Sequence, residues 1–595
     1  MNNLLHDIRR RLESYDWLSA SPAMLGWAVV VGVLGALTTA LFHEGIYLVQ
    51  RLATGNHGSI VAVATGLPWY GRILFPVAGG LVAGFLLIWA GKFKVGKSSD
   101  YMEAVAIGDG KLSLRQGLLR SVSSLFSVAS GGSIGREGAM VHMASLCASA
   151  IGRFGLFDTA RLRLLVACGA AAGVAAAYGT PLAGTLFIAE IVLGTMAIQS
   201  VGPLLIAASV SNMTMHWIGR YHVIYPVADG LAMPIAGHAW MVLLGIFAGL
   251  LAPLFLKLLD SSRSLFRASG LSLPLRLALG GLLLGTLLVF VPRAAGNGYS
   301  VVSSLLNDSW AWQAIMLILL CKILATAFTV GSGAVGGVFT PTIFVGAAFG
   351  TLFGMVVALF WPGAAAAQHL FTLAGMGAFL GAATGAPLMA ILMIFEMTQN
   401  YQVVVPLMLA CVLAHFVSRS VAEVAMYDVT LSRERDIVLR RTLRHTKLSE
   451  LIRPAQTVIR SDAPVKEALA MFLEYPVRYL YVVDDRNIFL GVIAQPDLTS
   501  LLLGHSNSQE KKAGDVLRLD FVKALYPDMR LDEAQELFVQ FQGERLPVVS
   551  RGEQPELLGV VYKSALLERY SALKRSLDQS GEALIDASVS SRSRG

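Results

Sequence analysis

Two oppositely charged side chains stand together in a glycine-rich turn between long apolar segments. Arg136 and Glu137 belong to SGGSIGREGAM at 130–140, and the segments on either side are almost entirely apolar. A glycine-rich turn that opens a helix presents unpaired backbone N–H groups, and the helix dipole adds about half a positive charge there. Such a turn can bind an anion without a cationic side chain in contact with it. The carboxylate of Glu137 is an anion on a tether, so it can compete for the same N–H groups.

A second turn of this kind, GGVFTP at 336–341, lies in the other half of the apolar region. Its Pro341 suits the first turn of a helix, where the missing N–H is not needed. If the two helix N-termini meet in the middle of a membrane, they form one desolvated anion site between them.

The composition predicts that a membrane surrounds these turns. The 595 residues are 55% hydrophobic and 14% charged, whereas soluble domains have about 25% charged residues. A full span needs roughly 20 apolar residues. Segments of about that length or a little shorter lie at 24–42, 72–90, 236–258, 274–292, 312–330 and 402–417. The segments 117–130 and 369–381 are too short, and we expect half-spans there, whose ends need protein or water around them.

The flanks of the apolar region are basic. The N-terminus carries Arg9, Arg10 and Arg11 without an apolar core before Ser21, so no cleavable signal peptide is expected. A second basic stretch, SRERDIVLRRTLRHTK, follows the last span at 432–447. Basic clusters favour the cytoplasmic side, so we expect a multi-pass protein of the inner membrane with both termini in the cytoplasm. These flanks account for most of the net charge of +8, and no nucleic-acid partner is expected.

The apolar half repeats itself. CGAAAGVAAAYGTPLAGTLFIAEI at 168–191 lines up with AGMGAFLGAATGAPLMAILMIFEM at 374–397, which pairs Glu190 with Glu396. Apolar segments broken by glycine and proline at matching places in two halves indicate a transporter whose substrate site lies at the repeat interface. The same pattern fits an inverted arrangement of the two halves.

The C-terminal region contains a second repeat with a different composition. VKEALAMF, with Glu467, matches LDEAQELF, with Glu533, and each unit reads as strand, helix, strand, strand, helix. The pattern predicts a small α/β module used twice. The last residues, 574–595, have the composition of a disordered tail.

These residues together match a known pattern. GREGA at 135–139, GVFTP at 337–341 and Tyr427 in AMYDV resemble the signature segments of the CLC family of chloride channels and chloride/proton exchangers. The C-terminal repeats resemble cystathionine-β-synthase (CBS) domains. The resemblance implies a mainly α polytopic membrane protein of two inverted repeats with broken helices, followed by a cytosolic α/β tandem CBS module. It divides the chain into a cytosolic segment 1–20, a transmembrane domain 21–430, a basic linker 431–446, CBS domains 447–505 and 513–573, and the tail 574–595.

The resemblance also implies roles for particular residues. In the family the glutamate of GREG is the gate, which here is Glu137. Arg136 is expected to brace the loop more than to touch the ion, and Phe339 has ordinary core packing as its alternative. The implied anion-binding set is Gly135, Arg136, Gly138, Lys97, Ser98, Val338, Phe339 and Tyr427. The implied partners are chloride or a similar anion, protons in an exchanger, the lipid bilayer and a second copy of the chain, with one pore per subunit.

One departure from the family concerns the central serine. Family members usually carry it in a Gly-Ser-Gly-Ile-Pro segment, whereas this chain has VGKSSDYMEA at 95–104. The serine position falls on Gly96, Lys97 or Ser98, depending on one gap. Either Lys97 faces the pore as a fixed cation, or Lys97 extends to the cytosolic edge and Ser98 coordinates the ion. Ala139, where many members have proline, is expected to change little.

A second departure concerns proton coupling. The exchangers carry two consecutive glutamates in a Phe-Ile-x-Glu-Glu context, and the second relays protons. Here FIAEIV provides Glu190 at the first position and Ile191 at the second, and an isoleucine cannot carry a proton. Glu190 is either a substitute station or, with Glu396, one of two symmetric structural carboxylates. We therefore expect passive, pH-gated conduction, with a chloride/proton antiporter as the alternative.

The two CBS modules differ at one position that matters for nucleotide binding. Nucleotide-binding modules usually end in an aspartate that holds the ribose hydroxyls. The first module has Asp497 in GVIAQPD, and the second has Ala565 in GVVYKSA. The resemblance implies at most one adenine-nucleotide site by this criterion. The alternative is that the pair only strengthens a dimer.

Two other classes of function were considered. A CBS-regulated magnesium transporter would need acidic residues inside the spans to hold a hard cation, and the candidates here are isolated. An enzyme would need a second acid, a nucleophile or a metal cluster near GREG, and the sequence has none of these. The four cysteines lie far apart in apolar segments and predict neither disulfides nor a metal site. We expect no catalytic residues, no metal and no required cofactor.

Overall fold

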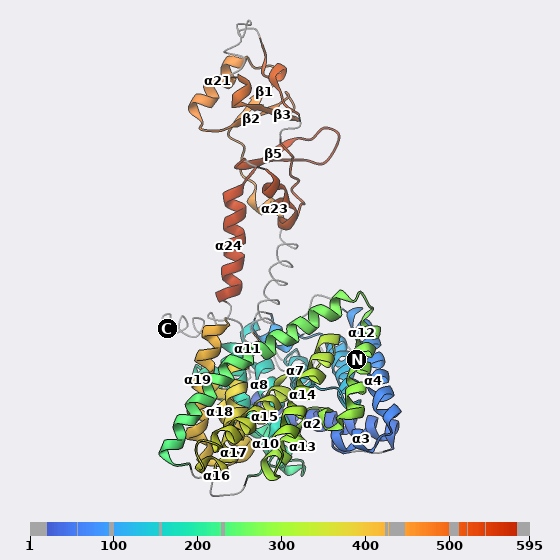
Figure 1. Cartoon of the computed structure of the whole chain (residues 1–595). Helices are drawn as coiled ribbons and strands as arrows, with labels where there is room; N and C mark the ends of the chain where they lie inside the picture. Colours follow the sequence, from blue (N-terminus) through green and yellow to red (C-terminus); the bar gives the residue numbers. More distant parts are fainter. Residues whose placement is uncertain are drawn as a thin grey trace. The chain divides into compact units, whose positions relative to one another are not determined.

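The computed structural model describes residues 21–55, 58–93, 100–106, 108–153, 157–194, 196–227, 233–422, 426–427, 447–498, 511–519, 522–541 and 543–579. The chain divides near residue 432 into two compact units, which are described separately below. The predictions for residues 1–20, Lys97, Ser98 and the linker 431–446 lie outside the described residues. Figure 1 labels the elements of both units.

The first unit is helical. Its first half contains α2 (Ser21–Thr54), α3 (Ile60–Gly66), α4 (Trp69–Gly91), α5 (Tyr101–Ala106), α6 (Leu114–Ala129), α7 (Glu137–Gly152), α8 (Thr159–Tyr178), α9 (Pro181–Leu186), the π-helix η2 (Phe187–Leu193) and α10 (Ile198–Trp217). Its second half contains η3 (Ile235–Gly237), α11 (His238–Ala268), α12 (Leu273–Phe290), η4 (Pro292–Ala294), α13 (Tyr299–Asn307), α14 (Trp312–Ser332), α15 (Phe339–Ala358), α16 (Gly363–Ala366), α17 (Gln368–Thr384), α18 (Pro387–Thr398), η5 (Tyr401–Val403) and α19 (Val404–Val421).

Eight of the described helices are long and apolar enough to cross a membrane, which makes this a multi-pass membrane protein. Six of them, α2, α4, α11, α12, α14 and α19, contain the spans expected from the sequence. The other two are α8, which contains the start of the first repeat segment, and α15, which begins within GVFTP. The segments predicted as half-spans lie in α6 and α17, which are too short to meet the same criterion.

The two halves use the same packing twice. Helix α4 packs on α6 and α12 packs on α14, while α7 packs on α8 and α15 packs on α17. In the same way α2 packs on α10 and α11 packs on α19. The pairs α7–α8 and α15–α17 are buried along most of their length, so the signature turns that open α7 and α15 lie in the core of the unit.

The repeat has the same backbone geometry in both halves. Helix α8 ends at Gly179, whose φ of 68° lies in the left-handed region, and α17 ends at Gly385, with φ of 76°. Pro181 and Pro387 then open α9 and α18. Glycine allows the left-handed turn and proline suits the first helical position, so the sequence repeat encodes two equivalent helix–turn–helix breaks.

The second unit contains the two predicted α/β modules. The first has η6 (Leu448–Leu451), β1 (Val458–Arg460), α21 (Val465–Glu474), β2 (Tyr479–Val483) and β3 (Phe489–Ala494), in a sheet of order β1-β2-β3. The second has η7 (Ala513–Val516), α23 (Leu531–Gln540), β4 (Arg545–Val549), β5 (Leu557–Tyr562) and α24 (Lys563–Gln579). In each module an antiparallel strand pair carries one bulge at the same place.

Two expectations for these modules need correction. The first strand of the second module is reduced to a single bridge between Leu525 and Val548, because Pro527 follows closely and cannot donate to a ladder. The tail was expected from residue 574, but α24 continues to Gln579. Its sequence SALKRSLDQ is rich in helix formers, which explains the longer helix.

Candidate functional site

The two glycine-rich turns meet backbone to backbone. Gly135 and Gly337 form an antiparallel bridge, in which Gly135 N donates to Gly337 O at 2.7 Å and Gly337 N donates to Gly135 O at 2.9 Å. Helix α7 begins two residues after Gly135, and α15 begins two residues after Gly337. The bridge therefore brings two helix N-termini together inside the protein, which is the arrangement that attracts an anion.

The carboxylate of Glu137 lies at the N-terminus of the opposite helix. Its Oε1 accepts the backbone N–H of Thr340, in the first turn of α15, at 3.2 Å. Its Oε2 has no hydrogen-bond partner among the described residues, and the residue is only 6% exposed. A buried carboxylate with one free oxygen at a helix N-terminus occupies the place where a small anion would bind.

Gly135 and Gly138 leave the space that this arrangement needs. A Cβ atom added at Gly135 would lie 1.7 Å from Glu137 Oε1, so any side chain there would displace the carboxylate. A Cβ atom at Gly138 would lie 3.2 Å from Gly337 N, which is a tight contact with the facing turn. A side chain at either glycine would therefore move the carboxylate or crowd the facing turn.

Arg136 turns away from its neighbour in the sequence. Its guanidinium lies over the ring of Tyr299 at 5.5 Å, and no ion pair joins it to Glu137 within the described residues. The cation–π contact ties the GREG turn to the start of α13. The bracing role expected for Arg136 stays a prediction, and Arg136 also lines a pocket with Arg220 and His222.

Phe339 and Tyr427 belong to one aromatic cluster. Phe339 packs on Tyr178 with ring centroids 5.4 Å apart, and on Phe187 at 6.0 Å. Phe187 in turn meets the ring of Tyr427 at 5.6 Å. Val338, the residue before α15, is buried beside them. The fold thus brings Gly135, Arg136, Glu137, Gly138, Val338 and Phe339 together, and Tyr427 joins them through Phe187.

Glu190 and Glu396 each cap the start of a helix in the opposite half of the membrane unit. Glu190, in η2, accepts the backbone N–H of Met389 in the first turn of α18 at 3.0 Å. Glu396, in α18, accepts those of Leu182 and Ala183 in the first turn of α9 at 2.9 and 2.8 Å. Unpaired N–H groups at a helix start need such acceptors. The reciprocal contacts are what a two-fold relation between the halves produces.

The sequence model of the family described as "Voltage gated chloride channel" matches residues 79–419, and that of the CBS domain matches residues 448–504 and 513–572. The chain belongs to the voltage-gated chloride channel family.

Relatives in this family cover the membrane unit. A "Putative chloride channel protein ClcB-like" of Ralstonia nicotianae is 47% identical over 430 residues, which is 70% of this chain and 98% of that protein. The "Voltage-gated ClC-type chloride channel ClcB" of Escherichia coli O17:K52:H18 is 42% identical over 406 residues, 67% of this chain and 96% of that protein. Both aligned lengths are close to that of the membrane unit, which extends to Ser432.

Solved structures of the family share the fold. A slow cyanobacterial Cl−/H+ antiporter aligns with a TM-score of 0.62 at 25% identity, covering 70% of this chain and 98% of the other. A eukaryotic CLC transporter aligns with a TM-score of 0.57 at 18% identity and covers 91% of this chain and 97% of the other. The family consists of transporters and channels and not of catalytic enzymes.

Sequence reasoning missed several residues of this CLC-type core. Thr340 provides the N–H that Glu137 accepts, and its Oγ1 lies 3.1 Å from the hydroxyl of Tyr178. Lys322 is fully buried in α14 and donates to the carbonyl oxygens of Ala294 and Gly296. The signal for Lys322 was present, since a lysine inside the apolar segment 312–330 is costly unless it has partners.

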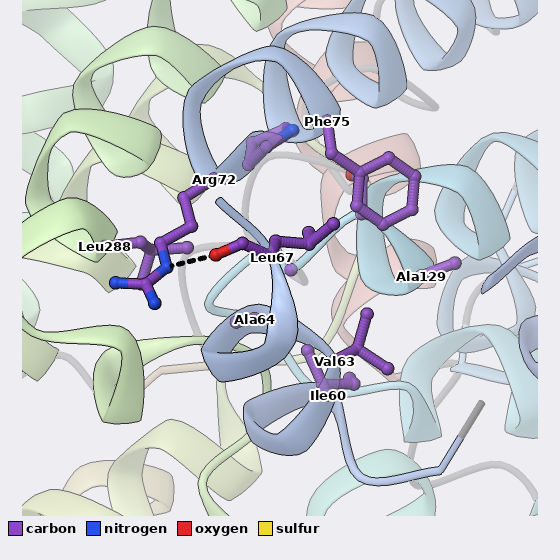
Figure 2. Close-up of a pocket in the computed structure, with 11 residues that line it drawn as sticks. Ile60, Val63, Ala64, Leu67, Arg72, Phe75, Ala129 and Leu288 are labelled. Atoms are coloured by element: carbon purple, nitrogen blue, oxygen red, sulfur yellow. Dashed lines mark hydrogen bonds between the residues drawn. The ribbon is translucent and has the colours of Figure 1, made fainter. Parts of the chain in front are cut away.

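A small hollow lies where α3 and α4 meet the end of α6. Figure 2 shows it between Ile60, Leu67 and Phe75, with Arg72 at its edge. The Arg72 Nε donates to Leu67 O at 3.0 Å, and its other nitrogens donate to Thr65 O and Val289 O. The hollow measures about 10 Å³ and is mostly apolar, so it has room for about one water.

Asp497 of the first CBS module already forms an ion pair. Its Oδ1 pairs with the guanidinium of Arg518, while its Oδ2 is buried without a partner among the described residues. The two modules also hold each other directly. Tyr479 donates its hydroxyl to Arg545 O, and Arg545 Nη2 donates to Tyr479 O at 3.1 Å.

Proposed function

We propose that this protein conducts chloride passively across the inner membrane through a pathway gated by Glu137. The observation that carries the proposal is the hydrogen bond from Thr340 N to Glu137 Oε1 at the N-terminus of α15. A carboxylate held by helix N–H groups occupies the position that an anion would take, so the ion and the side chain exclude one another. Membership in the chloride channel family supports chloride as the ion.

Gating follows from the chemistry of the carboxylate. When Glu137 is ionised, it competes with chloride for the N–H groups of α15. When it is protonated, it loses its charge and most of its advantage over the ion. Acidification of the compartment that reaches Glu137 therefore opens the pathway. Gly135 and Gly138 give the carboxylate and the facing turn the room that this exchange requires.

The residues at the position of the exchangers' proton relay favour passive conduction over proton exchange. Ile191 cannot bind a proton, and the neighbouring Glu190 accepts the N–H of Met389 as a helix cap. Glu190 is thereby held at the start of α18 by a structural hydrogen bond, which opposes a role in proton relay. The antiporter reading remains the second candidate, because a Cl−/H+ antiporter is among the structures that this chain resembles.

The protein acts as a homodimer with one pathway in each subunit and with both termini in the cytoplasm, as the family resemblance and the basic flanks suggest. The CBS pair regulates it by binding one adenine nucleotide at Asp497. The free, buried Oδ2 of that residue supports this role. Strengthening of the dimer by the CBS pair is the alternative.

The deciding experiment is a reversal-potential measurement on purified protein in lipid membranes under opposed chloride and pH gradients. We expect the reversal potential to follow the chloride gradient alone. A shift with the pH gradient would establish the antiporter instead. Failure of chloride to carry current or flux, while another ion does so, would overturn the proposal itself.

A further inference from the structure

A pocket with a basic lining lies next to the gate. Of the signature segments, it includes Arg136 of GREG. It measures about 90 Å³, enough for several waters. Two arginines and two histidines line it, and none of its lining residues within the described part of the chain is acidic. They are His43, Arg136, Arg220 and His222, which come from α2, the GREG turn and the segment after α10.

The wall of the pocket is held in place by specific contacts. The ring of Tyr221 stacks on His216 at 3.6 Å, with 17° between the ring planes, and its hydroxyl accepts from Gln399 Nε2 at 2.5 Å. Gly179 allows the ring to approach, because a Cβ atom there would lie 2.8 Å from Tyr221 Cε2. The opposite side is Tyr299, beneath the guanidinium of Arg136. The pocket is therefore a built feature of the fold.

Its positive charge is only partly compensated. Arg220 forms an ion pair with Glu44 of α2, one residue from His43. His43 Nε2 is buried without a hydrogen-bond partner among the described residues, and His43 shares the lining of the pocket with Arg136, Arg220 and His222. Two guanidinium groups, the imidazole of His222 and the unpartnered ring nitrogen of His43 surround the pocket. Such a lining favours a small anion.

The pocket is connected to the gate through two residues. Tyr178 lines the pocket, and its hydroxyl lies 3.1 Å from Thr340 Oγ1. Thr340 N donates to Glu137 Oε1 at 3.2 Å. Tyr178 and Thr340 therefore link the lining of the pocket to the carboxylate of Glu137.

We propose that this pocket is an anion-capture site that loads one small monovalent anion, such as chloride, before the ion reaches the paired helix N-termini. Arg220 supplies the charge that sets its affinity. Glu44 is a competitor within the protein, since its carboxylate draws on the same guanidinium as the ion. The inference rests on the proposed chloride conduction and assigns a second site to that pathway.

The test is exchange of radiolabelled chloride at equal chloride concentrations on both sides of proteoliposomes, at constant pH and ionic strength. Arg220→Gln should raise the half-saturating chloride concentration by about three- to tenfold, because one nearby charge is removed in partly hydrated surroundings. Glu44→Gln should lower it, because the competing carboxylate is gone. Arg220→Lys keeps the charge and should stay close to wild type.

The matched control is Arg263→Gln, which removes an arginine that also pairs with a carboxylate, Asp260, on α11 of the same unit. It should leave the half-saturating concentration unchanged. If the Arg220 and Glu44 variants shift in the same direction, or not at all, the ion pair is only structural and the capture site is refuted. Absence of exchange by the wild-type protein would refute the proposed function instead. Calorimetric titration of the same variants with chloride in detergent would then decide whether the pocket binds chloride. The affinity should shift in opposite directions for the Arg220 and Glu44 variants.

Discussion

Gly135 and Gly337 pair their backbones across the two halves of the membrane unit, with N–O distances of 2.7 and 2.9 Å. This bridge sets the spacing of the helix N-termini that begin at Glu137 and Phe339. Because the turns are joined to each other, a change in one of them acts on both helices. Next to this contact, the carboxylate of Glu137 accepts the backbone N–H of Thr340 in the opposite half.

The first prediction concerns Gly135→Ala. The added methyl group would occupy the position of Glu137 Oε1, so the carboxylate must leave the N-terminus of α15. Chloride flux in proteoliposomes should then lose most of its dependence on pH and approach that of a gate-deleted protein. Gly26→Ala is the control, since a Cβ atom at Gly26 meets nothing within 4 Å. A wild-type pH response in Gly135→Ala would show that the carboxylate does not gate from this position.

The second prediction concerns the gate itself. Glu137→Gln and Glu137→Ala should raise chloride flux at neutral pH and bring the ratio of flux at acidic to neutral pH close to one. The reason is that neither side chain carries a charge that competes for the N–H of Thr340. Asp260→Asn, which removes an exposed carboxylate of an ion pair on α11, should keep the wild-type ratio. A retained pH response in Glu137→Ala would exclude Glu137 as the gate.

The third prediction separates stability from transport. Glu396→Ala leaves two helix N–H groups without an acceptor, and Glu190→Ala leaves one. Each lost charge-assisted hydrogen bond costs roughly 1.5–3 kcal/mol. The unfolding temperature measured in detergent should therefore fall further for Glu396→Ala than for Glu190→Ala. Both variants should keep a reversal potential set by chloride. A larger drop for Glu190→Ala would contradict the assignment of these residues as caps.

The fourth prediction concerns the buried lysine. Lys322→Met would leave the carbonyl oxygens of Ala294 and Gly296 without this donor, next to the backbone contact of Gly296 N with Gly131 O. A buried group without a partner costs about 1–3 kcal/mol. We expect a lower unfolding temperature and a weaker pH response, because the loop before GREG loses support. Lys257→Met, at an exposed position of α11, should change neither.

The fifth prediction concerns the CBS pair. In the full-length protein, Asp497→Ala should abolish binding of an adenine nucleotide, measured by calorimetry. Arg518→Gln should strengthen binding by about two- to fivefold, since a partly exposed ion pair worth up to about 1 kcal/mol no longer has to open. Equal binding by wild type and Asp497→Ala would place any nucleotide elsewhere. Ala565→Gly, at the matching position of the second module, is the control and should bind like wild type.

The sequence predicted the main features of the fold for physical reasons. Long apolar segments can only be spans, and the repeated glycine and proline positions at 179–181 and 385–387 require equivalent breaks. The prediction of a first strand in the second CBS module was wrong because a pattern of apolar residues does not show how far a following proline shortens a strand. The helix that continues to Gln579 was missed because its composition is also typical of a tail.

The candidate site was predicted less completely. Glu137, Gly135 and Phe339 were found from motifs, whereas Thr340, Tyr178 and Lys322 were not. Their importance depends on contacts between segments far apart in the sequence, such as the 203 positions between Glu137 and Thr340. The placement of Lys97 and Ser98 stays a prediction, because both lie outside the described residues.

The sequence by itself determined that this is a two-repeat membrane protein with glycine-rich helix starts, because hydropathy, glycine and proline act locally through the backbone. The tertiary structure decided which carboxylate faces which helix. Glu137, Glu190 and Glu396 are each followed or preceded by apolar residues and look alike in sequence. The carboxylate of Glu137 reaches a helix N-terminus with one oxygen free, and the other two cap the opposite repeat. This difference arises only when the two halves pack together, since each acceptor belongs to one repeat and each donor to the other.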